Sequence, residues 1–162
     1  MPHKHKLIIA GNHEVKWQSP TFRNQLLSQY KTLTYLHETG VEINGVKFWG
    51  SPYQPEFCNW AFNVPRGERL AAHWAKIPED TDVLITHGPP YGFGDTNKQD
   101  FRFGDDDLLT RVLQIKPDIH CYGHAHHGYG QYFFEGIHFI NAASLNEDYH
   151  VQNPPVVVDY VS

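Results

Sequence analysis

The stretch DVLITHGPP at residues 82–90 decides the fold, because it joins an apolar strand to a polar loop. Val83, Leu84 and Ile85 form a near-continuous apolar centre, which is typical of a strand buried on both faces of a sheet. His87 then opens a loop rich in glycine and proline that extends to Gly104. Two other segments repeat this plan: Lys6–Ala10 leads into Gly11-Asn12-His13-Glu14, and Ile119–Tyr122 leads into Gly123-His124-Ala125-His126. We therefore predict three strands that each end in ligand-type side chains.

Helices and hairpins are expected between and around these strands. Asp105 is a suitable N-cap, and Asp106 and Asp107 suit the positive end of a helix, so we predict a helix over Asp105–Ile115. Further helices are predicted from Ser19-Pro20 to about Tyr30 and over Glu68–Ala75. Turns at Asn44-Gly45 and Glu135-Gly136 predict hairpins that join Val41–Ile43 to Val46–Trp49 and Gln131–Phe134 to Ile137–Ile140. We also expect a final strand at Val156–Tyr160, and Trp49, Trp60 and Trp74 in the core.

Composition bounds the class of protein. A chain of 162 residues with 40% hydrophobic side chains predicts one folded domain over residues 1–162. The net charge of −5 argues against binding to nucleic-acid polymers or membrane surfaces, which requires a basic patch. Residues 1–11 lack the apolar run of a secretory signal, and no window is apolar enough to span a membrane. Two separated cysteines, Cys58 and Cys121, give no disulfide pattern, so we expect a cytoplasmic protein.

The histidines indicate where chemistry is expected. The chain holds 12 of them, and histidine is the commonest metal ligand in proteins. Ligands of open α/β sheets bind beyond the carboxyl ends of the strands, so the three strand ends should meet at one place. His124 and His126 point the same way in an extended segment. Asn12 adds a hard amide oxygen, and a mixed nitrogen and oxygen set without thiolate favours hydrolytic chemistry.

These three strand-end blocks resemble the last three signature blocks of the calcineurin-like metallophosphoesterases. The blocks are Gly11-Asn12-His13-Glu14, Thr86-His87-Gly88-Pro89-Pro90 and Gly123-His124-Ala125-His126, and their order and spacing match as well. The flanking text, including WAFNVPRGERL at residues 60–70, resembles the metallophosphoesterase-domain-containing phosphodiesterase subfamily. The resemblance covers nearly the whole chain. It implies an α/β fold, the αββα metallophosphoesterase sandwich.

The resemblance also implies roles for particular residues. Asn12, His87 and His124 match three ligands of the second metal ion, and His126 matches a ligand of the first. His13 matches the histidine that stabilises the phosphoryl oxygens and protonates the leaving alkoxide. Two divalent ions in the complete domain, Mn²⁺ or else Fe, Zn²⁺, Mg²⁺ or Ni²⁺, would activate a hydroxide. The expected substrate is a small phosphoester or a nucleotide.

The chain departs from the family pattern at its start. The family has two earlier blocks, Asp-x-His and Gly-Asp, but only eleven residues precede Asn12 and none of them is acidic. Asp118-Ile119-His120, Gly94-Asp95 and Gly104-Asp105 carry similar letters, and we interpret all three as structural. We therefore expect an N-terminally truncated sandwich, the C-terminal two-thirds of a domain, with an uncovered sheet edge.

Several interpretations stay open on the sequence alone. Arg66 either contacts a phosphate or is a surface arginine before a helix. Tyr91 and Phe93 either stack on a substrate ring or pack against the aromatic loop Tyr53–Phe62. The leading hypothesis for function is a metal-dependent phosphodiesterase. The alternatives are a catalytically impaired binder of one metal ion or a nucleotide, and a chain whose partner supplies the missing ligands.

Overall fold

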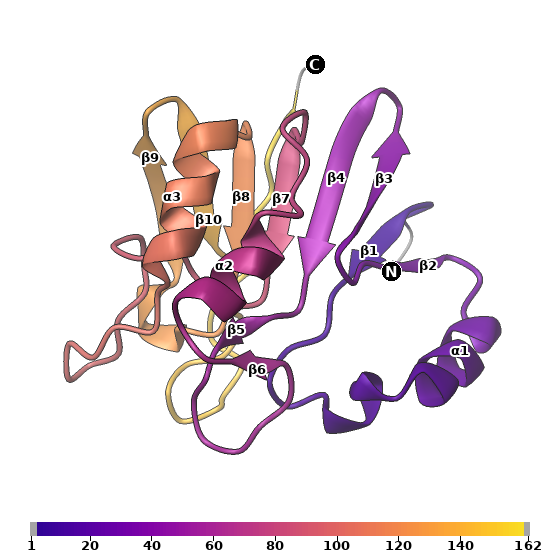
Figure 1. The fold of residues 1–162 in the computed structure, drawn as a ribbon, viewed down its shortest axis with the longest axis horizontal. Coiled ribbons are helices and arrows are strands. Elements are labelled where there is room, and N and C mark those ends of the chain that lie inside the picture. Colours follow the sequence, from indigo (N-terminus) through magenta and orange to yellow (C-terminus); the bar gives the residue numbers. More distant parts are fainter. Residues whose placement is uncertain (1–2, 161–162) are drawn as a thin grey trace.

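The computed structural model describes residues 3–160, and its centre is a six-stranded mixed sheet (Figure 1). The strand order is β3-β4-β7-β8-β10-β9, and the four inner strands run parallel. The strands are β3 (Thr39–Ile43), β4 (Val46–Ser51), β7 (Val83–Thr86), β8 (Ile119–Tyr122), β9 (Gly130–Phe134) and β10 (Ile137–Asn141). The apolar strand predicted from DVLITHGPP is thus β7, in the interior of the sheet.

The two outer strands are the predicted hairpin partners. Asn44 and Gly45 have φ values of 53° and 85° between β3 and β4, and Glu135 and Gly136 have 52° and 84° between β9 and β10. Positive φ at both central residues is the backbone of a type I′ turn, whose twist matches that of the strands it joins. Both hairpin predictions are confirmed, and they fix which residues of the edge strands face the core.

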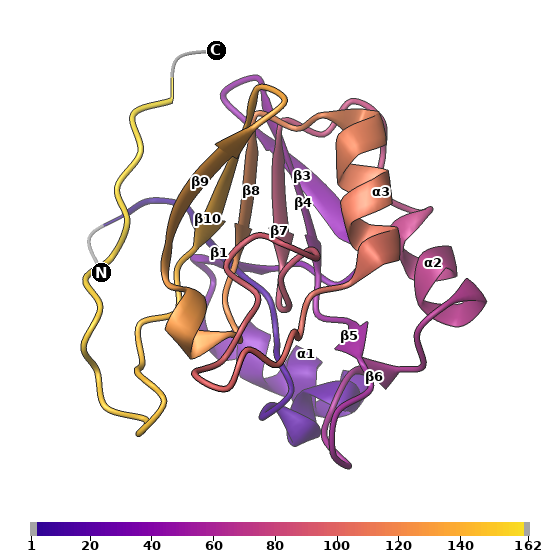
Figure 2. The same ribbon diagram turned by 90° about the vertical axis from the view of Figure 1, so that its left-hand side faces the viewer.

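Two helices cover one face of this sheet, as Figures 1 and 2 show from two directions. They are α2 (Glu68–Trp74) and α3 (Asp106–Ile115), and α3 is capped by Asp105 as predicted. The core between helices and sheet consists of Leu70, Trp74, Ile77, Leu84, Leu108, Val112, Tyr122, Ile137 and Phe139. Trp74 is 1% exposed, so its predicted place in the core is confirmed, and Trp49 packs against the same cluster.

The opposite face carries a smaller layer. Strand β1 (Lys6–Ile8) pairs in parallel with β2 (Leu33–Tyr35), and this pair forms a sheet of its own. Gly50 of β4 lies beneath this layer, where an added Cβ would be 2.5 Å from Cβ of Leu36. Only a glycine lets the two layers come so close. Ile85, Ile119 and Cys121 are only half-buried, so the second sheet layer is small in residues 3–160. The predicted α/β class is confirmed.

The remaining elements connect these layers. They are η1 (Val15–Gln18), α1 (Pro20–Gln29), η2 (His126–Gly128) and the short parallel pair β5 (Gln54–Pro55) and β6 (Asn63–Val64). The N-cap Ser19 accepts a hydrogen bond from Phe22 N, so the predicted start of α1 is confirmed. No residue of α1 is buried, and Figure 1 shows the helix beside the sheets and not upon them.

A cluster of charged and aromatic side chains ties the N-terminal layer to α2. Oε1 of Glu38, just before β3, lies 2.6 Å from His73 Nδ1, and Oε2 lies 2.8 Å from Lys76 Nζ. The His73 ring packs on Tyr53 with ring centroids 3.9 Å apart. Burial alone would raise the pKa of Glu38, but the hydrogen bonds from Lys76 and His73 outweigh it and lower the pKa.

The C-terminal segment differs from the expectation. The prediction of a strand at Val156–Tyr160 is wrong, because these residues form no β ladder with another strand. Figure 2 shows this segment running alongside the sheet on the side away from α2 and α3. It is fastened by a side chain, since Tyr160 OH donates a 2.5 Å hydrogen bond to Asp118 Oδ2. Its valines satisfy strand propensity, but a strand also needs a partner.

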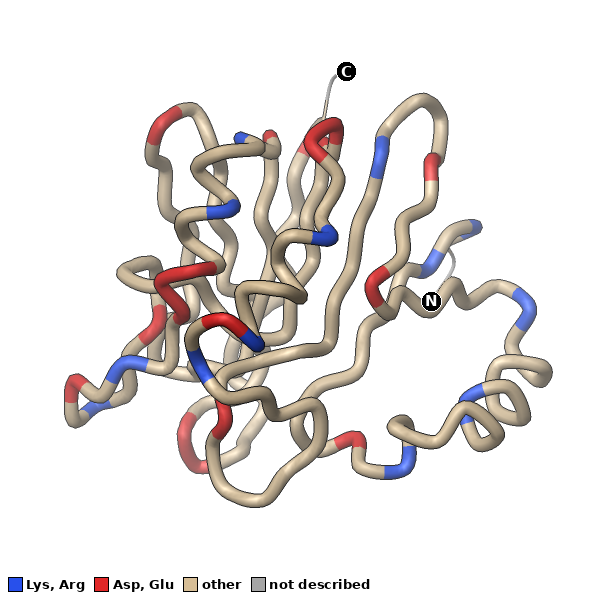
Figure 3. Tube along the Cα trace, in the orientation of Figure 1, with Lys and Arg blue, Asp and Glu red and all other residues tan. Residues whose placement is uncertain are grey.

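The charge distribution agrees with the low net charge. Figure 3 shows lysines and arginines spread along the trace, with aspartates and glutamates between them. Among the described residues, no helix is both long enough and apolar enough to cross a membrane.

Candidate active site

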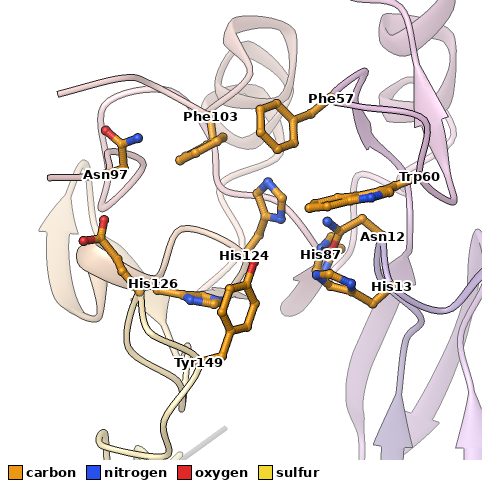
Figure 4. Close-up of a pocket in the computed structure, with 11 residues that line it drawn as sticks. Asn12, His13, Phe57, Trp60, His87, Asn97, Phe103, His124, His126 and Tyr149 are labelled. Atoms are coloured by element: carbon orange, nitrogen blue, oxygen red, sulfur yellow. Dashed lines mark hydrogen bonds between the residues drawn. The ribbon is translucent and has the colours of Figure 1, made fainter. Parts of the chain in front are cut away.

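The residues predicted from the three strand ends lie around one cavity of about 320 Å³ (Figure 4). Asn12 and His13 follow β1, His87 follows β7, and His124 and His126 follow β8. The remaining lining residues are Phe57, Trp60, Asn97, Phe103, Glu147 and Tyr149. The structure therefore brings together five of the six predicted site residues, and Arg66 is the exception.

Asn12 and His87 are in direct contact across the two layers. His87 Nε2 donates a 2.8 Å hydrogen bond to Asn12 Oδ1, and the side chain of Asn12 is buried. The His87 and His124 rings lie with their centroids 4.9 Å apart. Gly11 makes this contact possible, because an added Cβ there would be 2.4 Å from the His87 ring.

A buried histidine supports the loop that carries His87. Thr86 Oγ1 donates to Gly88 O at 2.7 Å and accepts from His120 Nε2 at 2.9 Å. Burial lowers the pKa of His120 to about 3, so this ring is neutral at pH 7 and acts as a hydrogen-bond donor. His120 is thus structural, as the sequence indicates, and it fixes the turn that presents His87.

The backbone at His124 is strained. Its φ is 67°, in the left-handed region that non-glycine residues seldom adopt. Ala125 N, the next residue, bonds back to Gly123 O at 2.8 Å and closes a tight turn. Such strained residues are concentrated at functional sites, where the surrounding structure holds them in place. Here the strain turns the imidazole of His124 toward His87.

Both of these imidazoles are kept uncharged. Burial, followed by the nearby His124, lowers the pKa of His87 to about 3. Burial, followed by His126, lowers the pKa of His124 to about 4. A neutral imidazole has a free lone pair and can bind a metal ion without first losing a proton. The pair is therefore prepared for ligation at pH 7.

The donor set fits one divalent ion at Asn12, His87 and His124. Asn12 Oδ1 and His87 Nε2 lie 2.8 Å apart, and both could bind one ion in the tautomer of His87 that carries its proton on Nδ1. Within residues 3–160, the amide nitrogen Nδ2 of Asn12 is buried without a hydrogen-bond partner. In residues 3–160, no three His, Cys, Asp or Glu side chains are grouped closely enough to hold an ion by themselves.

His126 lines the cavity and could bind an ion through Nε2. Its Nδ1 donates a 2.8 Å hydrogen bond to Asn146 O, and a metal-binding histidine commonly donates its second ring N–H to a backbone carbonyl. The carboxylate that lines the cavity belongs to Glu147, which accepts from Lys98 N at 2.9 Å and pairs with Lys98 Nζ at 3.1 Å. This pairing joins the loop after β10 to the loop before α3.

The candidate acid, His13, is exposed at the mouth of the cavity and packs on an aromatic side chain. Its ring centroid is 4.6 Å from that of Trp60. The prediction that Trp60 belongs to the core is therefore wrong, because the indole is only half-buried and lines the cavity. The only sequence signal for this side of the cavity was the aromatic loop Ser51–Val64. Composition does not show which way the side chains of a loop face.

The other candidates from the sequence have structural partners. Arg66 donates to Gly104 O at 2.7 Å, to Phe103 O at 3.2 Å and to Asp105 Oδ2 at 3.2 Å, outside the cavity lining. Asp95 pairs with Arg102 at 2.6 Å, so Gly94-Asp95 and Gly104-Asp105 are structural as predicted.

Two aromatic residues of the loop between β7 and α3 have ring partners other than those expected. Phe93 stacks on Phe139 with centroids 4.1 Å apart, and Tyr91 lies beneath Arg102. Neither side chain lines the cavity, and in the described ring pairs neither ring has a partner in the loop Tyr53–Phe62.

Solved structures share this fold. One covers 85% of this chain and 56% of its own, with a TM-score of 0.65 and 18% identity. A Thermus thermophilus protein covers 85% of this chain and 62% of its own, with a TM-score of 0.53 and 16% identity. At such identities the likeness concerns the fold alone.

Sequence comparisons identify the family. The chain is 35% identical over 182 residues to metallophosphoesterase domain-containing protein 1 of Homo sapiens, which covers 98% of this chain and 56% of that protein. It is 39% identical over 168 residues to a UPF0046 protein of Caenorhabditis elegans, with 96% and 57% covered. The chain thus spans about half the length of these curated relatives. Residues 1–128 match the profile of the calcineurin-like phosphoesterases, and the chain belongs to that family.

Proposed function

We propose that this chain carries the active site of a metal-dependent phosphodiesterase that acts on small phosphoesters or nucleotides. The observation that carries the proposal is the meeting of Asn12, His87 and His124 in one cavity, with the two imidazole centroids 4.9 Å apart. Family membership supports the reaction class, phosphoester hydrolysis with divalent metal ions. We favour Mn²⁺ because the ligand set mixes an amide oxygen with imidazole nitrogens.

Each side chain has a part in this proposal. Asn12, His87 and His124 would hold one ion, and His126 would bind a second. Bound ions supply a hydroxide at neutral pH and positive charge for the phosphoryl oxygens. The three donors are neutral, so they leave the charge of the ion uncompensated and favour an anionic substrate. His13, exposed at the mouth beside Trp60, would protonate the leaving oxygen.

The proposal is tested with bis(p-nitrophenyl) phosphate and Mn²⁺. We expect hydrolysis by the unaltered chain and loss of at least about 100-fold in kcat/KM for His87→Ala and His124→Ala, because each removes a ligand. His138→Ala is the matched control, since His138 lies on β10 and bonds to Gln131. Hydrolysis that survives both ligand substitutions would refute the proposal.

The second candidate function is the binding of one metal ion or a nucleotide without turnover. It is favoured by the pairing of Glu147 with Lys98, which leaves the described cavity without an unpaired carboxylate for a second ion. Metal content per chain, measured together with turnover, separates the two. One ion without hydrolysis supports the binder, and two ions with hydrolysis support the enzyme.

We further propose a cytoplasmic location, which fractionation of cells would test.

A further inference from the structure

Three aromatic side chains form a continuous wall on one side of the cavity, which we name the aromatic wall: Phe57, Trp60 and Phe103. The ring centroids of Phe57 lie 5.5 Å from those of both Trp60 and Phe103. Both contacts are edge-to-face, with interplanar angles of 74° and 90°. This packing is favourable for aromatic pairs, so the three rings support one another.

The aromatic wall adjoins the candidate acid at one end and a candidate ligand at the other. Trp60 packs against His13 at 4.6 Å, and Phe103 packs edge-on against His124 at 5.2 Å. Figure 4 shows the three rings on one side of the cavity with the histidines beside them. A group held against the wall is therefore next to anything bound at the histidines.

The rings are available to a ligand. All three are only half-buried, although they come from two loops that could have folded them into the core. An apolar cavity of about 150 Å³ holds one benzene ring, and this cavity measures about 320 Å³. It therefore has room for a planar ring together with a phosphoryl group.

We propose that the aromatic wall is a specificity site, which binds a planar aromatic ring of the substrate while the phosphoryl group lies at the histidines. The inference rests on the proposed function for the position of the phosphoryl group. The chain then prefers phosphoesters that carry an aromatic ring over alkyl phosphoesters of equal charge. Stacking of a ring on aromatic side chains strengthens binding by roughly fivefold to 150-fold.

The experiment compares two ligands that are not hydrolysed, phenylphosphonate and methylphosphonate, by calorimetry in the presence of Mn²⁺. We expect phenylphosphonate to bind at least about tenfold more tightly to the unaltered chain. Trp60→Ala and Phe103→Ala should reduce this ratio toward one, whereas Trp60→Phe should retain most of it. Phe133→Ala is the matched control, since Phe133 is 74% exposed on β9.

Two results would overturn the inference. One is equal affinity for the two phosphonates, or no binding of either, in the unaltered chain. The other is a ratio that survives Trp60→Ala and Phe103→Ala, because the wall would then serve only to pack His13 and His124. Turnover of bis(p-nitrophenyl) phosphate is measured on the same samples. Turnover without a ring preference refutes this inference alone, and a ring preference without turnover refutes only the proposed hydrolysis.

Discussion

Replacement of Asp105 by alanine tests how the loop before α3 is held in place. Oδ1 of Asp105 accepts from Leu108 N at 2.9 Å and from Trp74 Nε1 at 2.8 Å. Oδ2 accepts from Arg66 Nη1 at 3.2 Å. The Asp105→Ala substitution removes the helix cap and leaves the buried indole N–H of Trp74 without a partner. We expect a marked loss of stability.

The magnitude follows from these contacts. Loss of an N-cap costs about 1 kcal/mol, and a buried donor without a partner costs roughly 1–3 kcal/mol. The contact with Arg66 adds little, because the Arg66 side chain is 46% exposed and solvent screens it. Burial raises the pKa of Asp105, so removing its buried charge offsets part of the loss. The net expectation is about 3 kcal/mol, or roughly 6–12 °C in Tm.

The assay is urea unfolding of the two chains at pH 7, followed by circular dichroism. Asp105→Asn is the control, because its amide oxygen can still accept from Leu108 N and Trp74 Nε1. We expect it to lie within about 1 kcal/mol of the unaltered chain. The reasoning fails if Asp105→Ala costs less than about 1 kcal/mol, or if asparagine is as damaging as alanine.

Two further predictions concern the site and the N-terminal layer. Gly11→Ala places a Cβ 2.4 Å from the His87 ring, so it should weaken Mn²⁺ binding by about 100-fold or more in calorimetry. Gly123→Ala, where a Cβ meets nothing within 4 Å, should bind normally, and equal affinities in the two variants would contradict the proposed geometry. Glu38→Gln should cost about 1 kcal/mol at pH 7, because Lys76 loses its anionic partner. The lowered pKa of Glu38 means that its contribution is present above the usual carboxyl range and disappears as pH falls through the lowered value. Urea midpoints of the two chains should therefore converge in acid, and a constant difference down to about pH 3 would argue against the ion pair.

The sequence predicted the elements whose signals are local. The type I′ turns at Asn44-Gly45 and Glu135-Gly136 depend on two residues each, and both occur. The cap at Asp105 is equally local. Val156–Tyr160 has the composition of a strand but no partner, and β2 (Leu33–Tyr35) has no strong pattern and pairs only because β1 lies beside it. Strand pairing is a property of the whole fold, so neither outcome could be read from a short window.

Some residues of the candidate site could likewise be predicted from local sequence, and others could not. Asn12, His87 and His124 could be expected together, since each follows a strand and strand ends share one edge of a sheet. The direction of Trp60 could not be expected, because an indole is as suited to a core as to a cavity wall. The aromatic loop is held by a backbone hydrogen bond from Ala61 N to Asn12 O at 3.0 Å. This bond joins segments that are far apart in the chain.

The position of Asn12 also links ion binding to the stability of the fold. Asn12 belongs to the segment after β1, whereas His87 and His124 follow strands β7 and β8 of the six-stranded sheet. An ion held by all three cross-links the two layers, so its binding energy adds to the docking of the N-terminal segment. At a concentration of 100 times Kd this amounts to about 2.7 kcal/mol. Divalent ions would thereby tether the N-terminal segment, whose strands β1 and β2 form a sheet separate from the six-stranded one in residues 3–160.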